Sequence, residues 1–368
     1  MIPMIDLTRG YIDHEWQMME AISEICRSQK FILSEWTERL ERDLRPWVGE
    51  SYAVACSSGT DALVMALTAA GIGPGDEVIT SPFTFIATAG AIVRVGAKPV
   101  FVDIDPLTFC IDPAKIEKAI TVHTAAIIPV HIFGQCCDMD KINAIAARNE
   151  LVVIEDACQA IGATWRDTLA GNIGDFGAFS FFPSKNLGGF GDSGMVSTKH
   201  MVTADRLRIM RCHGGVGYEH AMHGGNYRID EIQAAALCIK LPRLHVAIAK
   251  RRTNACRYLC ALGGVSGIVT PYCHPLASHT FNQFTIRVLD GKRDALRRHL
   301  TCKGIGCAVY YPIPLHLQEC YASLGYRAGD LPEAERAAAE VLSLPIYPEL
   351  SYAEHAEICH EIRAFMSV

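Results

Sequence analysis

The sequence lacks the features that mark a membrane, fibrous or disordered protein. No run approaches the ~20 consecutive apolar residues of a membrane-spanning helix. No low-complexity tract, charge block or internal repeat interrupts the chain. The first residues carry no basic segment followed by an apolar core, so they do not read as a secretory leader. These absences predict a cytoplasmic protein with no membrane partner.

A strong excess of charge of one sign is missing as well. The formal net charge is −6 over 368 residues, which leaves no overall basic field of the kind that binds nucleic acid. With 50% hydrophobic and 20% charged residues, the composition is that of an ordinary globular protein. The chain length suits one or two domains, and no nucleic-acid partner is expected.

The chain has 15 cysteines, yet no two of them form a C-x-x-C pair. Their scatter predicts small buried apolar side chains in a reducing compartment. One group has the residue types of a zinc site: Cys212, His213, His220 and His223. Its spacing fits no common zinc site and it lies among glycines, so we expect a mobile loop and no metal.

Apolar runs typical of strands alternate with helical segments from residue 52 onward. These strands are centred on Val54, Val78, Val100, Ile127, Val153 and Phe179. Residues 13–48 carry helical spacing of apolar groups before the first strand. The alternation predicts an α/β fold, a mostly parallel sheet with helices on both faces.

A second, smaller α+β domain is predicted toward the C-terminus. A long helical pattern over 230–262, interrupted near Pro242, is expected to connect two lobes. Beyond it we predict strands at 281–288 and 307–311 and helices at 294–303 and 352–365. We predict a large α/β domain at 1–245 and a smaller domain at 246–368. The N-terminal helical segment could also pack on the smaller domain.

Lys185 is the first candidate for chemistry. It follows an apolar run that ends in Phe181 and Phe182, and a glycine-rich stretch with Phe190 comes after it. Apolar surroundings lower a lysine pKa because they disfavour the ammonium form, and a neutral amine can form a Schiff base. A lone lysine in such a turn is more often a surface residue, so its neighbours decide the interpretation.

Two other stretches supply those neighbours. Asp156 ends a buried-strand run, at the strand end where ligands bind in α/β folds. Ser58, Gly59 and Thr60 read as a turn into a helix whose free N–H groups suit a phosphate. A phosphate cradle, a strand-end aspartate and a Schiff-base lysine are together what pyridoxal phosphate (PLP) requires. Taken singly, Asp156 and the serine pair could each be a helix cap.

A series of motifs resembles the DegT/StrS sugar aminotransferases, in order and from Ile2 to about Ile362. They are SSGTDAL at 57–63, GPGDEVIT at 73–80, FTFIAT at 83–88, GAKPVFVDIDP at 96–106, IPVH at 128–131, EDA at 155–157, PSKNLG at 183–188 and YPIPLH at 311–316. The resemblance implies a fold-type I PLP enzyme that works as a homodimer with active sites at the interface.

The resemblance also assigns roles around the cofactor. Lys185 would carry PLP and then move the proton between the donor carbon and the cofactor, while Asp156 would keep the pyridine nitrogen protonated. Further cofactor contacts are implied for Phe85 on the ring face, Gln159 near the ring hydroxyl, Ser180 beside Gly59 and Thr60 at the phosphate, and Asn226 from the neighbouring subunit. Without the resemblance, Phe85 would more often be a buried core residue, and Gln159 would simply be a polar side chain on a helix.

Three residues are implied on the substrate side. Arg228 is the natural partner for an anion, since its planar fork can pair with a carboxylate or phosphate, although a surface ion pair is an equal alternative. Tyr311 and His316 belong to the motif that faces the sugar in the family. Tyr227 departs from the serine that the family more often has before the arginine.

The predicted function is transfer of an amino group, from L-glutamate as donor, to a keto group of a nucleotide-linked deoxysugar in aminosugar or polysaccharide biosynthesis. An aminotransferase for a keto-cyclitol or other non-nucleotide keto-sugar stays open. A PLP-dependent sugar dehydratase is disfavoured because Lys185 is present. A regulatory PLP-binding protein is the least favoured alternative. The nucleotide, the sugar and the aminated carbon stay undetermined.

Overall fold

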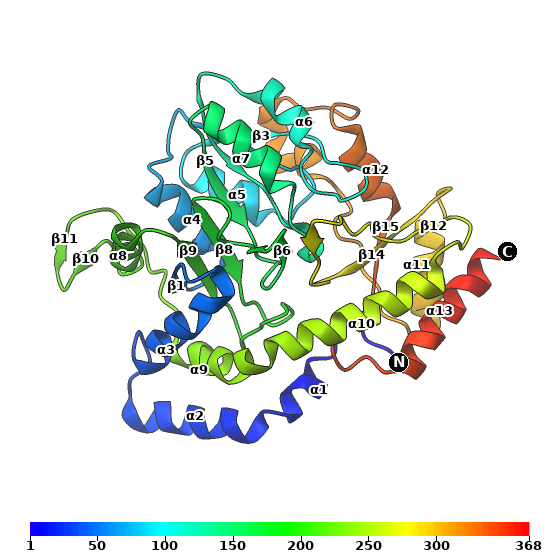
Figure 1. The fold of residues 1–368 in the computed structure, drawn as a ribbon, viewed down its shortest axis with the longest axis horizontal. Helices are drawn as coiled ribbons and strands as arrows, with labels where there is room; N and C mark the ends of the chain where they lie inside the picture. The colour runs from blue at the N-terminus through cyan, green and yellow to red at the C-terminus, as the bar shows by residue number, and fades with distance from the viewer. Residues whose placement is uncertain (368) are drawn as a thin grey trace.

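A seven-stranded sheet forms the centre of the molecule in the structure, a computed structural model that describes residues 1–367. Its order is β1-β9-β8-β5-β4-β2-β3, and β9 is antiparallel to both of its neighbours while the other pairs are parallel (Figure 1). The strands are β1 Tyr52–Cys56, β2 Glu77–Thr80, β3 Lys98–Phe101, β4 Thr124–Ile128, β5 Val152–Asp156, β8 Phe176–Ser180 and β9 Gly194–Thr198.

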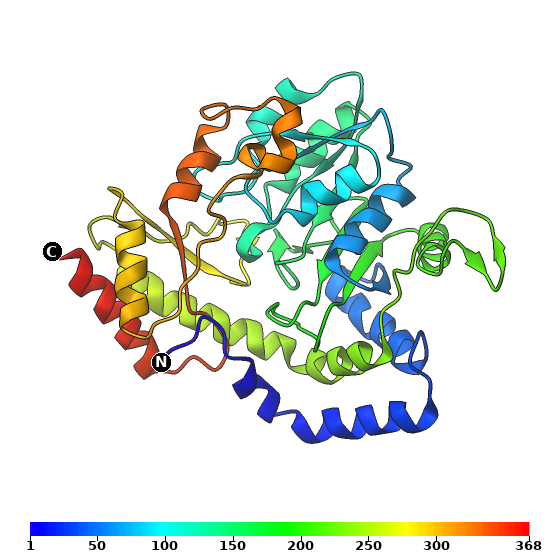
Figure 2. The same cartoon turned by 180° about the vertical axis from the view of Figure 1, so that it is seen from behind.

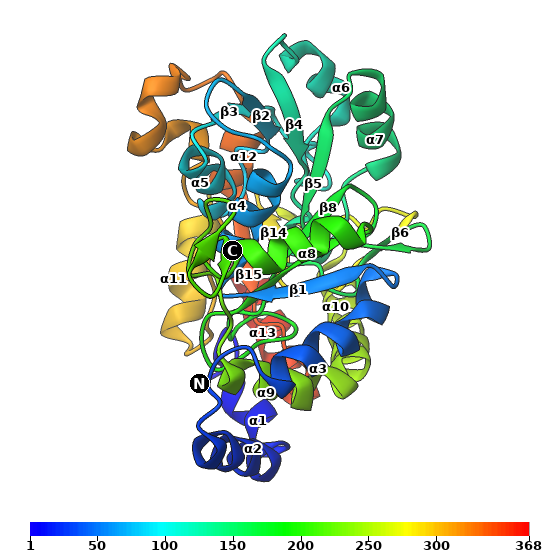
Figure 3. The ribbon, with the colours of Figure 1, turned by 90° about the vertical axis from the view of Figure 1, so that its left-hand side faces the viewer.

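Helices cover both faces of this sheet, which confirms the predicted α/β class. Buried side chains of α4 and α8 pack on one face, and those of α3 and α7 pack on the other (Figure 3). The strands read as continuous apolar runs because both of their faces are buried. The helices in this lobe are α4 Gly59–Ala69, α5 Ala87–Arg94, α6 Pro113–Ile116, α7 Met139–Arg148 and α8 Met201–Met210.

The six predicted strands of the sheet are present, and β9 is the strand that the pattern missed. All five residues of β9 are buried, but the run follows a glycine-rich loop and is short. Three smaller two-residue strands, β6 Thr164–Trp165, β7 Thr168–Leu169 and β13 Ala277–Ser278, form a separate sheet.

The first two helices, α1 Leu7–Ile12 and α2 Glu15–Ser28, run beneath the long helix pair that joins the lobes (Figure 2). The pair is α9 Glu231–Lys240 and α10 Leu244–Leu262, and α3 Glu35–Leu44 packs against α9 and β1. The predicted interruption near Pro242 is a single 3-10 turn. The segment Glu231–Leu262 is long and apolar enough to cross a membrane by length and composition, yet α9 and α10 contribute Leu237, Leu244 and Ile248 to the main core.

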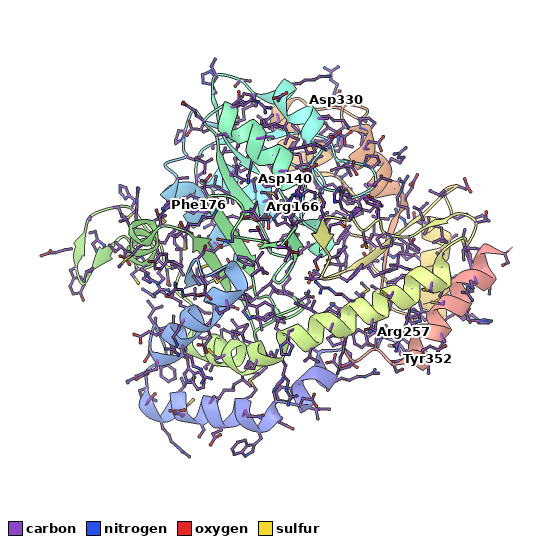
Figure 4. The ribbon with its side chains drawn as sticks, in the orientation of Figure 1. Asp140, Arg166, Phe176, Arg257, Asp330 and Tyr352 are labelled. Carbon is purple, nitrogen blue, oxygen red and sulfur yellow. The ribbon has the colours of Figure 1, made fainter. Side chains whose placement is uncertain are left out.

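The smaller lobe has its own sheet and apolar core. It contains β12 Ile268–Val269, β14 Phe284–Val288, β15 Val341–Leu344, α11 Arg293–Cys302 and α13 Tyr352–Met366. Arg257 of α10 lies 5.6 Å over the ring of Tyr352, which ties the linking helix to α13 (Figure 4). The predicted strand at 307–311 is wrong, because only Ala308 makes a bridge, to Ser343.

The chain crosses between the lobes more than once. Ile2 pairs with Ile305, so the N-terminus joins the smaller lobe, while Leu331 and the buried face of α12 Pro332–Glu340 pack in the main core. The division at residue 245 falls at the start of α10 and stays a prediction.

The predicted loop with the metal-type residues is a projecting hairpin, β10 Gly215–Val216 paired with β11 Glu219–His220 (Figure 1). Cys212 bridges to Asn226 at the base of this projection. Within residues 1–367 no three His, Cys, Asp or Glu side chains are grouped to hold a metal ion.

Candidate active site

The loop between β8 and β9 places Lys185 at the edge of the sheet. Ser180 ends β8 and pairs with the first residue of β9, so the loop begins and ends at one point. The Lys185 amide donates to the carbonyl oxygen of Phe182 at 2.8 Å and tightens the turn. Burial lowers the pKa of the Lys185 amine, an effect that Cys158 and Asp156 partly oppose. More of this amine is therefore neutral than in a solvated lysine.

Asp156 ends β5 on the same edge and is only 5% exposed. The hydroxyl of Thr88, from α5, donates to Asp156 Oδ2 at 2.7 Å, and the amide of Cys158 donates to Oδ1 at 3.2 Å. Thr84 lies 3.0 Å from the Thr88 hydroxyl. Two donors on this buried carboxylate fix its orientation.

A buried histidine and carboxylate support the strand end from behind. The amide of Cys137 donates to His131 Nδ1 at 3.2 Å, so Nε2 carries the proton and donates to Glu155 Oε2 at 2.9 Å. Glu155 also accepts the amide of Gly171 at 2.8 Å. The His131 amide in turn donates to the Asp156 carbonyl oxygen at 3.0 Å. This network holds the backbone of Asp156 in place.

Gln159 joins the sheet edge to the smaller lobe. Its Oε1 accepts the amide of Phe133 at 2.6 Å, and its Nε2 donates to the Tyr311 hydroxyl at 3.1 Å. Burial raises the pKa of Tyr311, so the phenol stays neutral and keeps its own proton for another acceptor. The ring of Phe85 lies 6.3 Å from that of Tyr311 and is 57% exposed, which leaves an aromatic face open at the site.

The start of α4 forms the predicted cradle. Ser58 caps the helix by accepting the Asp61 amide at 3.0 Å, so its hydroxyl is already used within the chain. The amides of Gly59 and Thr60 precede the first intrahelical donor, the Ala62 amide, which donates to the Ser58 carbonyl oxygen at 2.9 Å, so both stay available to a ligand. A Cβ added at Gly59 would lie 2.7 Å from the Ser180 Cβ, so only glycine allows this close approach of helix and strand.

The remaining predicted residues are not hydrogen-bonded to Lys185 or Asp156 in the described chain, although the Tyr227 carbonyl oxygen, between Asn226 and Arg228, accepts the Ser57 amide at 2.9 Å. Asn226 is exposed at the base of the hairpin, and Arg228 Nε is buried with no partner among residues 1–367. His316 is 2% exposed, and its Nε2 lies 3.1 Å from Glu335 Oε1. Within the described chain no hydrogen bond joins these three side chains to Lys185 or Asp156, and their substrate or cofactor roles stay predictions.

The gathered residues fit PLP by their chemistry. An amine of lowered pKa, a doubly hydrogen-bonded carboxylate, an open aromatic face and a glycine that admits close backbone approach match the aldehyde, pyridine nitrogen, ring and phosphate of that cofactor. Lys185 would attach it, Asp156 would face its nitrogen, and Gly59, Thr60 and Ser180 would hold its phosphate.

Comparison with known proteins decides the family. The model of the DegT/DnrJ/EryC1/StrS aminotransferase family matches residues 13–363. The chain belongs to this family. It is 44% identical to the UDP-N-acetyl-3-dehydro-alpha-D-glucosamine 3-aminotransferase of Acidithiobacillus ferrooxidans, over 98% of this chain and 97% of the relative. It is also 48% identical to a protein of Geobacillus stearothermophilus named pleiotropic regulatory protein, over 99% and 98% of the two chains.

A solved family member has nearly the same fold. The crystal structure of DesV from S. venezuelae, in complex with a ketimine intermediate, superposes with a TM-score of 0.97 at 39% identity and covers 100% of this chain and 99% of DesV. The predicted family, fold type, PLP cofactor and class of sugar aminotransferase are thereby confirmed.

Sequence reasoning missed the residues that hold Asp156. Thr88 lies in the FTFIAT motif that was read for its aromatic residue, and His131 closes the IPVH motif. A threonine on a helix that follows a strand end, and a histidine before a predicted turn, were the available signals.

Proposed function

We propose that this DegT-family member transfers the amino group of L-glutamate to a keto group of a nucleotide-linked deoxysugar, in the cytoplasm, for aminosugar or polysaccharide biosynthesis. The observation that carries the reaction class is the Lys185 amine, whose pKa is lowered by burial, on the same sheet edge as the hydrogen-bonded Asp156 carboxylate. The substrate class is supported by relatives named as transaminases of UDP- and dTDP-linked sugars, at 36–44% identity.

Each residue has a defined task in this reaction. PLP, when bound, supplies the electron sink that makes the donor's α-carbon acidic. Lys185 Nζ would anchor the cofactor and, once freed by the donor's amine, would move the proton from the donor carbon to the cofactor's aldehyde carbon, a task for which its lowered pKa leaves it partly neutral. The charge of Asp156 would keep a proton on the ring nitrogen. Thr88 fixes that carboxylate.

The aromatic and polar groups around this centre would orient the substrates. Tyr311 keeps its proton, as its pKa is raised by burial, and can donate it to a sugar oxygen beside the open face of Phe85. His316 would contact the acceptor only after turning from Glu335, to which it lies close in this structure. Arg228 has an unpartnered Nε among residues 1–367, which suits an anionic group of the substrate.

We further propose a homodimer whose sites are completed by the partner. Phe85, Phe182 and Phe190 near the site and Tyr218 on the hairpin are exposed apolar side chains in the single chain. Asn226 stands at the base of the projecting hairpin, where a side chain can reach a second molecule. It would then contact the cofactor phosphate of the partner.

The deciding experiment is an absorbance spectrum of the PLP-loaded protein before and after L-glutamate, followed by a panel of nucleotide-linked keto-sugars. Conversion of the cofactor to its amine form by glutamate, and its return with one keto-sugar, is the expected result. Return with a non-nucleotide keto-sugar or keto-cyclitol, and with none of the nucleotide-linked ones, would reject the proposed acceptor while keeping the reaction class.

A regulatory role is the second candidate, because the relative at 48% identity is named a pleiotropic regulatory protein. A regulator would bind PLP without needing a proton-transfer lysine, whereas Lys185 is present here with a lowered pKa, on the same sheet edge as Asp156. Bound PLP that no amino donor converts would favour this alternative.

A further inference from the structure

A cavity lies on the side of the lysine loop that faces the N-terminal segment and α10. Its volume is about 360 Å³, and its walls come from the lysine loop, the first fourteen residues, the junction of α9 with α10 and the turn after β15. In Figure 2 the N-terminal segment passes directly below α10 at this place. We name it the Arg251 pocket, and the residues that matter are Lys185, Asn186, Lys240, Lys250, Arg251 and Tyr347.

Three polar atoms in the walls of this pocket are buried without a partner. They are Arg251 Nε, Asn186 Oδ1 and Tyr347 Oη, which make no hydrogen bond to any of residues 1–367. Arg251 is 4% exposed, and its Nη1 donates to three carbonyl oxygens, the shortest contact being 2.9 Å to that of Ile346. Buried polar atoms normally have partners, and here three residues that line the pocket each keep one buried polar atom without a partner.

The charges in the walls do not balance. Asp13 pairs with Arg243 at 3.3 Å, and Asp6 pairs with Arg9 at 3.0 Å. Once Lys185 is committed to the cofactor, Lys240, Lys250 and Arg251 remain against the single carboxylate of Glu349. Lys240 Nζ donates to the Gly188 carbonyl oxygen at 2.7 Å, and no carboxylate of the described chain lies within ion-pair distance of it. The surplus of two positive charges points to an anionic ligand.

The size of the pocket suits a small ligand. Its volume of about 360 Å³ gives room for a five-carbon dicarboxylate. We propose that the Arg251 pocket binds the carboxylates of the dicarboxylic amino donor. The proposal rests on the proposed function, since the donor's amine must reach Lys185, which lines the same pocket.

The test separates the donor from the acceptor half-reaction. Lys250 is exposed at the rim, so Lys250→Glu is expected to fold normally. It should raise the concentration of L-glutamate for half-maximal conversion of the PLP form by about tenfold or more, as expected for a lost charged hydrogen bond. Conversion by L-alanine, which has no second carboxylate, should change much less, and the return step with the keto-sugar should not change. Lys118→Glu, an exposed lysine outside the pocket, is the matched control.

A binding measurement keeps the test independent of turnover. Glutarate, which has two carboxylates and no amine, should bind the PLP-loaded protein in a calorimeter and bind Lys250→Glu at least about tenfold more weakly. Equal glutamate constants in the variant and the wild type would overturn the proposal. So would uridine diphosphate binding that Lys250→Glu weakens while glutarate does not bind. If no donor converts the wild-type cofactor, the proposed function fails, and glutarate binding still decides whether the pocket takes a dicarboxylate.

Discussion

Two regions of the molecule differ in how completely one chain specifies them. The cofactor floor, made of Lys185, Asp156, Thr88, Gln159 and Gly59, is held by hydrogen bonds and close contacts between separate elements. The hairpin arm, residues 212–228, instead projects from the body and exposes most of its side chains. The residues proposed to hold the cofactor are thus positioned by contacts within one chain. The hairpin arm instead exposes a surface that a second molecule can contact.

Removing the Lys185 amine should abolish transamination. We expect Lys185→Ala to lower turnover by at least about 10⁴-fold, since one residue acts as both anchor and proton carrier. The absorbance of lysine-bound cofactor should disappear while the circular dichroism spectrum is unchanged. Turnover near the wild-type rate in this variant would refute the assignment.

Neutralising the aspartate should give the next largest effect. Asp156→Asn keeps the shape but no longer holds a charge beside the ring nitrogen, so we expect a rate loss on the order of a hundredfold or more. Cofactor affinity, measured by titrating apoprotein with PLP, should fall as well. Unchanged kinetics would show that Asp156 only caps the turn that follows β5.

Mixing two defective chains tests the arm. Asn226→Ala and Lys185→Ala homodimers should both be weak, but random exchange of subunits should restore about a quarter of wild-type turnover, because each mixed dimer has one complete site. The activity of mixed and separate samples, together with the mass from light scattering, is the measurement. A monomer of full activity would contradict both the dimer and the role of Asn226.

A smaller loss of rate is expected when the hydrogen bond from Thr88 to Asp156 is removed. Thr88→Val removes the donor to Asp156 Oδ2, and a hydrogen bond to a charged group typically contributes ~1.5–3 kcal/mol, so about a tenfold loss in rate is expected. Thr88→Ser keeps the hydroxyl and should rescue most of it. The pH titration of the bound cofactor's absorbance should shift in the valine variant and not in the serine variant. Equal spectra in both would leave Thr88 with a packing role only.

The segment behind the lysine loop gives the smallest predicted effect, on stability. Burial and the charge of Arg252 lower the pKa of His279 to about 3, and its Nδ1 accepts the Phe281 amide at 2.9 Å. Between pH 6.5 and about 3 the unfolded chain therefore binds a proton that the folded chain does not, and the free energy of unfolding falls as pH drops. His279→Gln should lessen the fall in melting temperature between pH 7 and pH 5. An identical pH dependence in both proteins would contradict it.

Much of the fold followed from local patterns. The apolar runs around Val54 and Val153 are strands because both faces of a covered sheet are buried, and the helical spacing over 230–262 is α9 and α10. Residues 307–311 also alternate suitably, but the chain there pairs at only one position because it crosses from the smaller lobe to the main core. Pairing partners, unlike periodicity, depend on distant segments.

The candidate site was predictable where chemistry is carried by one residue type. A lysine after a strand, an aspartate at a strand end and a glycine at a helix start each have a local signature, and the structure gathers them. The support of Asp156 by Thr88 had none, since threonine is common on helices and its acceptor lies 68 positions away. The surroundings of the Arg251 pocket likewise join the two ends of the chain.

The lysine loop has one more consequence, for protein engineering. Because Ser180 and Gly194 are paired neighbours on adjacent strands, residues 181–193 leave and re-enter the sheet at a single point. Such a segment is a defined unit for exchange between family members, provided that Phe181 and Leu187, which are buried in the main core, are kept. Grafting residues 181–193 from other family members would then vary the substrate range while β8 and β9 stay the same.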